Sequence, residues 1–408
     1  MIIGMLNMSR YRAVLALPGV RSLLAVGLLG RLPSACAAIV LTLYVVLDLD
    51  RGYAAAGLIG AGVTIGAALG TPLLGRFVDR YGLRPVVAAT AVVEAIFWCT
   101  AQALPYPALA VAALAGGLLR LPAFPLVRQS IAAIVPPERR RSAYALDSMA
   151  VELSFIVGPA LAVLLATTAG PRAAMLALAA TALASGVAFY LLDPPVRTEA
   201  EGVGTDPAVP LRQWLRPRLV GMLAVAAATT LVLGGSDVAV VAAMRDADQV
   251  GWTGVVLALW GAYSLAGGFA YGAASRAPGP AALLVLMAAC TVPVGLGGGQ
   301  WWLLALALLP AGVLCAPTLA ATADVISRLA PAQVRGVAMG LHGSAVTVGL
   351  AVGAPLSGAV MDLRSPPWGF AATGLVGLAV ALTVLLGERR RRAAEPPPDR
   401  AGQLDLAS

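Results

Sequence analysis

Long runs of apolar residues, separated by short polar segments, recur along the whole chain. About 20 apolar residues in a helix span the hydrocarbon core of a bilayer, so each run is long enough to form a helix that crosses a membrane. The runs cover residues 22–47, 53–75, 86–104, 107–128, 144–167, 173–192, 219–242, 252–274, 280–298, 301–322, 337–360 and 366–387. The pattern predicts an all-α polytopic membrane protein with 12 transmembrane helices.

The composition agrees with this pattern and excludes an ordinary soluble domain. Of the 408 residues, 59% are hydrophobic and 12% are charged, whereas soluble domains are roughly 45–50% apolar and about 25% charged. The first run (22–47) is too long for a removable signal peptide, so we expect it to remain as a helix. Met8, directly before Ser9 and Arg10, is an alternative start to Met1.

The distribution of arginine predicts how the chain is oriented in the membrane. All 28 basic residues are arginines; 22 fall in segments on the side of the N-terminus and four in loops on the other side. Arginine is enriched in cytoplasmic loops, so both termini are expected in the cytoplasm and the protein in the plasma (inner) membrane. This topology accounts for the net charge of +8 without nucleic acid. The expected partners are the lipid bilayer and a small-molecule substrate, with a monomer as the oligomeric state.

The two halves of the chain resemble each other at an offset of 195 residues. The segment 115–122 aligns with 310–317, and Gly158 aligns with Gly353 at the same offset. Two parallel six-helix halves are a common build of secondary transporters. The predicted division is an N-terminal bundle (1–192), a polar linker (193–217), a C-terminal bundle (218–387) and a basic, proline-rich tail (388–408).

A short motif follows the second apolar run. Residues 75–85 have the sequence GRFVDRYGLRP, which resembles the G-x-x-x-D-R-x-G-R-[RK] signature of the major facilitator superfamily (MFS). The matching residues are Gly75, Asp79, Arg80, Gly82 and Arg84; Leu83 stands where a basic residue is expected. The resemblance implies the MFS fold of two pseudo-symmetric six-helix bundles and transport by alternating access.

In this family the motif's carboxylate faces the start of span eleven. Asp79 would then lie near Gly336 and Val337, where the N–H groups of a helix N-terminus attract negative charge. We expect this contact to latch the outward-facing state, although the neighbouring arginines also fit the simpler role of topology charges. Gly158-Pro159 resembles part of the G-x-x-x-G-P element of drug/proton antiporters, which favours export.

Small residues recur every four positions in four spans, a spacing that lets helix backbones approach closely. They form the interface between the halves in the fold that the chain resembles, whereas generic packing in an Ala/Gly-rich protein is the alternative. The stripes are Gly62-Gly66-Gly70, Ser154-Gly158-Ala162, Gly268-Gly272 and Gly349-Gly353-Ser357.

Four charged residues lie within apolar runs of the first half at a similar depth. These are Arg31, Glu94, Arg120 and Glu152. Charges at this depth must pair or line a wet cavity, so we expect one layer of charge, with Glu152 beside an arginine as the proton-coupling group. A structural network of ion pairs is the alternative. Cys315, which corresponds to Arg120, predicts a more apolar wall in the second half.

Three other polar residues are candidates for gate contacts. Asp147 and His342 occupy equivalent positions in spans five and eleven, where solvation at the membrane interface is the favoured interpretation. Asp237 lies near the outer end of span seven, where an external gate is expected.

These features predict a secondary transporter that exports a small, fairly hydrophobic compound by proton antiport. Proton-linked uptake of a metabolite is the alternative, in which Arg31 and Arg120 would bind an anion. A transport-incompetent sensor or scaffold is the alternative from another class. The sequence has one histidine, no cysteine cluster and no phosphate-binding loop, so no metal, cofactor or enzymatic activity is expected.

Overall fold

The computed structural model describes residues 8–197, 210–274, 277–297 and 299–394, and this part of the chain forms helices and no strands. The helices are α1 (Met8–Leu15), α2 (Val20–Leu47), α3 (Tyr53–Tyr81), α4 (Leu83–Thr100), α5 (Tyr106–Leu118), α6 (Ala123–Ile134), α7 (Arg140–Thr168), α8 (Pro171–Leu192), α9 (Leu211–Trp214), α10 (Pro217–Asp246), α11 (Thr253–Ala273), α12 (Pro280–Thr291), α13 (Trp301–Leu329), α14 (Arg335–Leu363) and α15 (Pro366–Ala394).

Twelve stretches are long and apolar enough to cross a membrane, which confirms the predicted number of spans. Five of them combine more than one helical segment. Helices α5 and α6 together form span four, α4 and α12 are each followed by a 3-10 turn in spans three and nine, and α11 and α14 are each preceded by one in spans eight and eleven. Parts of the predicted linker (193–217) and tail (388–408), and the choice between Met1 and Met8 as the start, lie outside the described residues.

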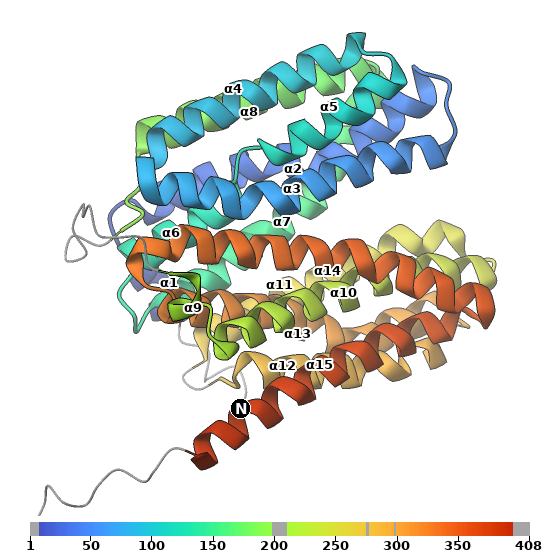
Figure 1. Cartoon of the computed structure of the whole chain (residues 1–408). Coiled ribbons are helices and arrows are strands. Elements are labelled where there is room, and N and C mark those ends of the chain that lie inside the picture. The colour runs from blue at the N-terminus through green and yellow to red at the C-terminus, as the bar shows by residue number, and fades with distance from the viewer. Residues whose placement is uncertain (1–7, 198–209, 275–276, 298, 395–408) are drawn as a thin grey trace, which may run out of the picture.

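The helices form two bundles, one of α2–α8 and one of α10–α15 (Figure 1). The same pairs of spans pack together in both: α2 packs on α7 and α8 as α10 packs on α14 and α15, and α3 packs on α5 as α11 packs on α13. The two bundles meet through α3 on α14 and α7 on α11, which are again equivalent pairs. The predicted pseudo-symmetry of two six-helix halves is therefore confirmed.

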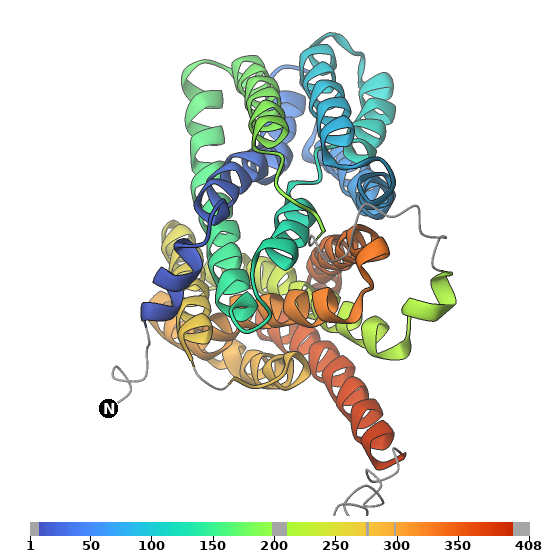
Figure 2. The ribbon, with the colours of Figure 1, turned by 90° about the vertical axis from the view of Figure 1, so that its left-hand side faces the viewer.

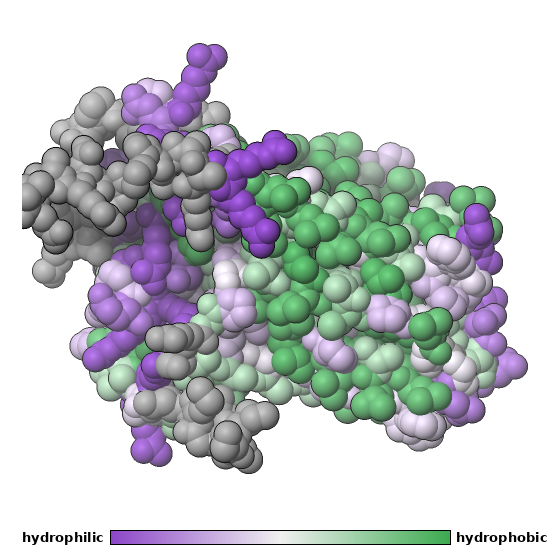
Figure 3. Space-filling view, turned by 90° about the horizontal axis from the view of Figure 1, so that it is seen from below, coloured by the Kyte–Doolittle hydropathy of each residue, from purple (hydrophilic) through white to green (hydrophobic). Residues whose placement is uncertain are grey.

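The surface has the polarity of a membrane protein. A broad hydrophobic area lies between hydrophilic ends (Figure 3), and large apolar side chains are exposed on it, among them Val111, Leu164 and Leu191 at 71%, 59% and 74%. Such an area would be unfavourable in water and suits lipid. The protein is therefore a multi-pass membrane protein.

One end of the molecule carries the end of α8, the start of α10, α1 and the end of α15 (Figure 1). We name it the linker end, and the opposite end the distal end. Figure 2 looks onto the linker end, where the two bundles meet and α1 lies beside their junction. The Tyr11 hydroxyl of α1 donates to the Phe269 carbonyl of α11, and its ring stacks on Phe269 with 5.2 Å between centroids. Burial raises the pKa of Tyr11 to about 12, so it stays a donor at neutral pH.

The stripes of small residues serve mainly to pack helices within each half, which corrects the interface interpretation for most of them. Gly66 and Gly70 lie against the backbone of α5, and Gly349 and Gly353 against that of α10. Of the predicted stripes, Gly268-Gly272 lies between the halves, against Met149 and Ala145 of α7 and Tyr11 of α1.

Candidate functional site

The gate motif lies where α3 meets α14. Asp79 accepts hydrogen bonds from the backbone N–H groups of Gly336 and Val337, each 3.0 Å long, at the N-terminus of α14. The side-chain amide of Gln129 in α6 donates to the same carboxylate at 3.0 Å. A carboxylate with three donors at a helix N-terminus is well stabilised. The structure thus places Asp79 where the family resemblance expected it, and the role of a latch stays a prediction.

The other motif residues support this contact or face away from it. Gly75 approaches the backbone of Gly336 so closely that a side chain at either position would collide with the partner helix. Gly82 ends α3 with a φ of 85°, which favours glycine. Arg80 lies over Tyr81, and Arg84 pairs with Asp193 at the exposed surface of the same half. These two arginines do not join the halves.

We expect Asp79→Asn to shift the protein toward a state that is open at the linker end. An asparagine has one acceptor oxygen and cannot satisfy three donors, and hydrogen bonds to a charged group contribute about 1.5–3 kcal/mol each. The open-to-closed ratio should rise about tenfold or more. The measurement is the electron–electron distance between spin labels on cysteines at Glu138 and Gly279, here named the linker-end pair, which are exposed positions of the two halves.

The label experiment uses a background in which Cys36, Cys99, Cys290 and Cys315 are replaced by alanine. The matched control is Asp193→Asn, because Asp193 pairs with Arg84 at the exposed surface and such pairs contribute about 0–1 kcal/mol. An Asp79→Asn distance distribution equal to that of the control would contradict the latch.

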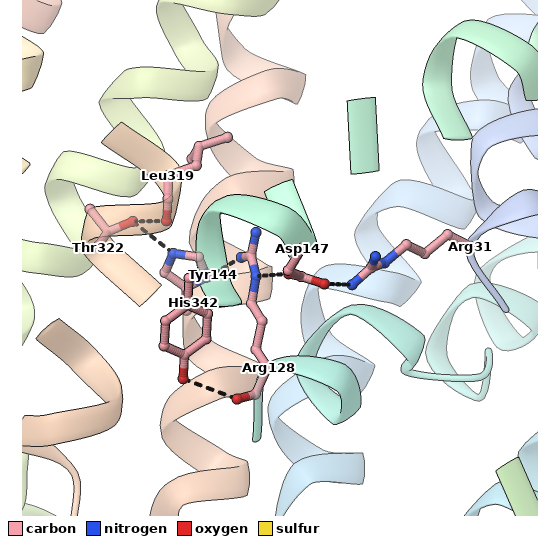
Figure 4. A network of polar contacts seen from close by, with 7 residues as sticks. All are labelled: Arg31, Arg128, Tyr144, Asp147, Leu319, Thr322 and His342. Carbon is pink, nitrogen blue, oxygen red and sulfur yellow. Dashed lines mark hydrogen bonds and ion pairs between the residues drawn. The ribbon is translucent and has the colours of Figure 1, made fainter. Parts of the chain in front are cut away.

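A buried polar network joins the two halves deeper in the molecule (Figure 4). Asp147 of α7 accepts from Arg31 of α2 and, at 3.1 Å, from Arg128 of α6. Arg128 also contacts Nδ1 of His342 in α14 at 2.9 Å, and Nε2 of His342 lies 3.0 Å from Thr322 of α13. Five helices therefore meet through one chain of side chains.

The donors and acceptors of this network fix the state of His342. An arginine has no acceptor, so Nδ1 of His342 must accept from Arg128 and Nε2 carries the proton. The Nε2–H then donates to Thr322, whose hydroxyl donates to the Leu319 carbonyl at 2.9 Å. His342 is therefore a neutral imidazole that holds a cation of the other half.

This arrangement corrects the interfacial interpretation of Asp147 and His342. Both side chains are 0% exposed, so neither is solvated at a membrane surface. From the sequence we also expected Arg128, at an inner helix end, to pair with Asp324 across the bundle. Arg128 instead connects Asp147 and His342, and Asp324 pairs with Arg328 of its own helix. Arg128 lies in α6 after the break in span four, where the helical periodicity of α5 no longer indicates which way a side chain points.

The four charges expected in one layer belong to three separate sites, which corrects that expectation. Arg31 pairs with Asp147. Glu94 of α4 accepts the backbone N–H of Leu121 at 3.0 Å, next to Arg120 in the break between α5 and α6. Glu152 has neither arginine beside it.

Glu152 instead faces the second half. Its carboxylate accepts a hydrogen bond of 2.7 Å from Ser264 of α11, and the Ser264 oxygen accepts the backbone N–H of Ala316 in α13 at 3.2 Å. Because the Ser264 oxygen accepts from the Ala316 N–H, the Ser264 hydroxyl proton is directed to Glu152. The wall opposite Glu152 is therefore polar at this point, within a second half that the sequence predicted to be more apolar.

Asp237 of α10 is a second acidic residue within a span, in the half opposite Glu152; we name these two residues the acidic pair. Among the described residues, neither carboxylate takes part in an ion pair. At about 1.5 Å per residue, Glu152 is roughly 18 Å from the linker end of α7 and Asp237 roughly 30 Å from that of α10. Both carboxylates therefore lie within their helices and away from the linker end.

The element Gly158-Pro159 lies inside α7, which continues to Thr168. A side chain at Gly158 would meet Cys36 and Ala35 of α2 at 3.1 and 3.2 Å. The glycine thus brings α2 and α7 together within the first half. This contact sets the spacing of the two helices that carry Arg31 and Asp147.

Among the residues that the structure describes, hydrogen bonds between the halves are confined to the linker half of the molecule. In the described part of the chain, those nearest the distal end are Ser264 to Glu152 and, at 2.5 Å, Ser344 of α14 to the Ala68 carbonyl of α3. No group of three or more metal-binding side chains occurs among the described residues. The structure is closed at the linker end. The acidic pair, Glu152 and Asp237, lies farther along the molecule toward the distal end.

Comparisons with known proteins agree on the fold. Residues 23–297 and 275–408 match the model of the Major Facilitator Superfamily. No curated protein sequence matches the chain significantly. Similar solved structures include the human organic anion transporter MFSD10 (TETRAN; 20% identity, TM-score 0.70), covering 90% of this chain and 100% of that one.

Two other similar structures come from proteins with different substrates. A bacterial homologue of the iron transporter ferroportin in an outward-facing state is 16% identical, with a TM-score of 0.73 and coverage of 90% and 100%. The proton:xylose symporter XylE is 15% identical, with a TM-score of 0.69 and coverage of 90% and 95%. At these identities the likeness shows the fold and not the substrate.

Proposed function

Because the chain belongs to the Major Facilitator Superfamily and is a secondary transporter that works by alternating access, we propose that it exports small hydrophobic cations in exchange for protons. The observation that carries the proposal is the acidic pair, Glu152 and Asp237. Two carboxylates from opposite halves, without a cationic partner, suit a ligand or a proton that neutralises them. Export agrees with the resemblance of Gly158-Pro159 to drug/proton antiporters.

The arginine distribution supports a cytoplasmic linker end and a plasma-membrane location. With this orientation, the closed linker end corresponds to an outward-facing state. Protons from outside would then reach Asp237 first and Glu152 second, displacing a bound cation outward. After the halves rock, Glu152 would release its proton to the cytoplasm and accept the next cation.

The uptake of an anion receives less support from the arginines. Arg31 is fully buried and held by Asp147, and Arg120 belongs to the break in span four, next to Leu121, whose N–H donates to Glu94. Of the two arginines, Arg31 is the less available to an anion. An anion bound by Arg31 would have to replace a carboxylate of the protein. Glu152 and Asp237 take part in no ion pair among the described residues, and these two carboxylates favour a cation.

The test compares two probes of the same shape and opposite charge, tetraphenylphosphonium and tetraphenylborate. The protein is reconstituted into vesicles with an imposed proton gradient. We expect gradient-driven movement of the cation that exceeds the rate in protein-free vesicles, and none of the anion. Transport of the anion alone, or no movement of either probe, would overturn the proposed function.

Glu152→Gln is expected to lower gradient-driven transport of the cation at least tenfold. Glutamine keeps the acceptor for Ser264 but cannot take up or release a proton, so folding should survive while coupling is lost. The matched control is Glu138→Gln, an exposed glutamate between α6 and α7, which should transport as the wild type does. Normal gradient-driven transport by Glu152→Gln would remove this residue from the mechanism.

A further inference from the structure

We propose that Glu94 is the clamp of a hinge in span four, which positions α6 so that it closes the linker end. The clamp is a positioning site and does not touch the substrate. The inference goes beyond the proposed function, since it requires neither proton coupling nor a particular substrate.

The break in span four is the first observation. Helix α5 ends at Leu118 and α6 begins at Ala123, so residues 119–122 interrupt an otherwise apolar span. The N–H of Arg120 bonds three residues back, to Gly117 at 3.4 Å, and the N–H of Ala123 bonds to Leu121 at 2.9 Å. The regular bonds four residues back are lost here, and proline at 122 has no N–H to offer.

Glu94 satisfies the backbone at the break. In a continuous helix the Leu121 N–H would donate to the Gly117 carbonyl; here it donates to Glu94 at 3.0 Å. An unpaired N–H inside a membrane protein costs several kcal/mol, so a side-chain acceptor is needed for the break to persist. Glu94 is 3% exposed, so its carboxyl group is held inside the protein beside this N–H.

The second half shows that the proline alone does not break the span. Pro317 corresponds to Pro122, yet α13 runs without interruption from Trp301 to Leu329. Cys315 stands where the first half has Arg120. The half with the break also has Pro125, where the second half has Ala320. It also has the buried Glu94, which accepts the Leu121 N–H, and we assign the persistence of the break to Glu94.

The helix beyond the break carries contacts that close the linker end. Arg128 of α6 bonds to Asp147 and to His342 of the other half, and Gln129 donates to Asp79. Helix α6 packs on α2, α3 and α7 of its own half and on α13 and α14 of the other. A change in the direction of α6 at residues 119–122 would therefore move Arg128 and Gln129 together, and with them the contacts to His342 and Asp79. Glu94 thus controls the gate from a distance through a short helix.

The experiment follows the linker-end pair, without substrate or proton gradient, in three variants. Glu94→Leu removes the acceptor and should raise the open-to-closed ratio at least tenfold. Glu94→Gln keeps a weaker, neutral acceptor and should raise it about threefold. Thr90→Val is the matched control, because Thr90 is equally buried one turn earlier in α4 and bonds only within its own helix; its ratio should equal the wild type's.

Amide hydrogen exchange is the second measurement. It distinguishes a local effect at the break from a general loss of stability. In Glu94→Leu, exchange of the amides at 119–121 should accelerate more than that of amides in α5. A wild-type ratio and wild-type exchange in Glu94→Leu would overturn the hinge. If Glu94→Leu does not fold, Glu94→Gln decides: an unchanged ratio overturns the proposal and a raised one supports it. The proposed function has its own test, the transport of cations, and can fail without changing this result.

Discussion

Asp147→Asn is expected to cost the protein about 3–5 kcal/mol of stability, the typical effect of breaking a buried ion pair by removing one partner. Arg31 is 0% exposed, and its Nε and one terminal nitrogen have no hydrogen-bond partner. Without the charge of Asp147, Arg31 and Arg128 would remain as two uncompensated buried cations. The measurement is the free energy of unfolding in mixed detergent micelles.

The control is Asp48→Asn. Asp48 pairs with Arg172 at 2.8 Å, but this arginine is 63% exposed, so the loss should stay within about 1 kcal/mol. A second variant separates charge from packing: adding Arg31→Met to Asp147→Asn removes one of the uncompensated cations and should recover part of the lost stability. Equal stability of Asp147→Asn and Asp48→Asn, or no recovery in the double variant, would contradict the electrostatic explanation.

The buried network also explains why charges deep in the bilayer are tolerated at all. Each charged group in it has a partner on another helix, and the partners come from both halves. When the linker end opens, the contact between Arg128 and His342 must break or shift, whereas Arg31 and Asp147 belong to one half and can remain paired. The network thus divides into a permanent part and a switching part.

The fold was predictable because the bilayer imposes it. A helix that crosses lipid must satisfy its own backbone and present apolar side chains, so twelve spans can be identified by length and hydropathy. The repeat between 115–122 and 310–317 indicated two equivalent halves. The position of Asp79 near Gly336 followed from the family motif and not from the physics of the residues.

The partners of the buried charges were not predictable in the same way. The sequence gives depth, at about 1.5 Å per residue, but not the direction of a side chain relative to helices whose packing is unknown. Arg31, Glu94 and Glu152 share a depth, yet they face α7, the break in span four, and α11 respectively. Predicting the break would have required knowing that Glu94, which lies 27 residues before Leu121, accepts the N–H of that residue.

Glycine positions at the interface of the halves predict a second large effect. A methyl group at Gly340 of α14 would lie 2.6 Å from Cα of Pro72 and 2.7 Å from the Thr71 carbonyl oxygen, both in the backbone of α3. Backbone atoms cannot turn aside as a side chain can. Overpacking of this kind costs about 1–3 kcal/mol, and the collision exists only while the linker end is closed.

Gly340→Ala should therefore raise the open-to-closed ratio of the linker-end pair at least tenfold, without loss of folding. Two glycines of the same helix provide graded controls. A methyl group at Gly343 would lie 3.2 Å from the Thr71 side chain, which can give way, and nothing lies within 4 Å at Gly358. All three substitutions raise helix propensity equally, by about 1 kcal/mol, so propensity cannot account for a difference between them. If steric contact with α3 sets the equilibrium, the ratio rises in the order Gly358→Ala, Gly343→Ala, Gly340→Ala. Equal ratios in the three variants would instead mean that the halves do not need this close approach to shut the linker end.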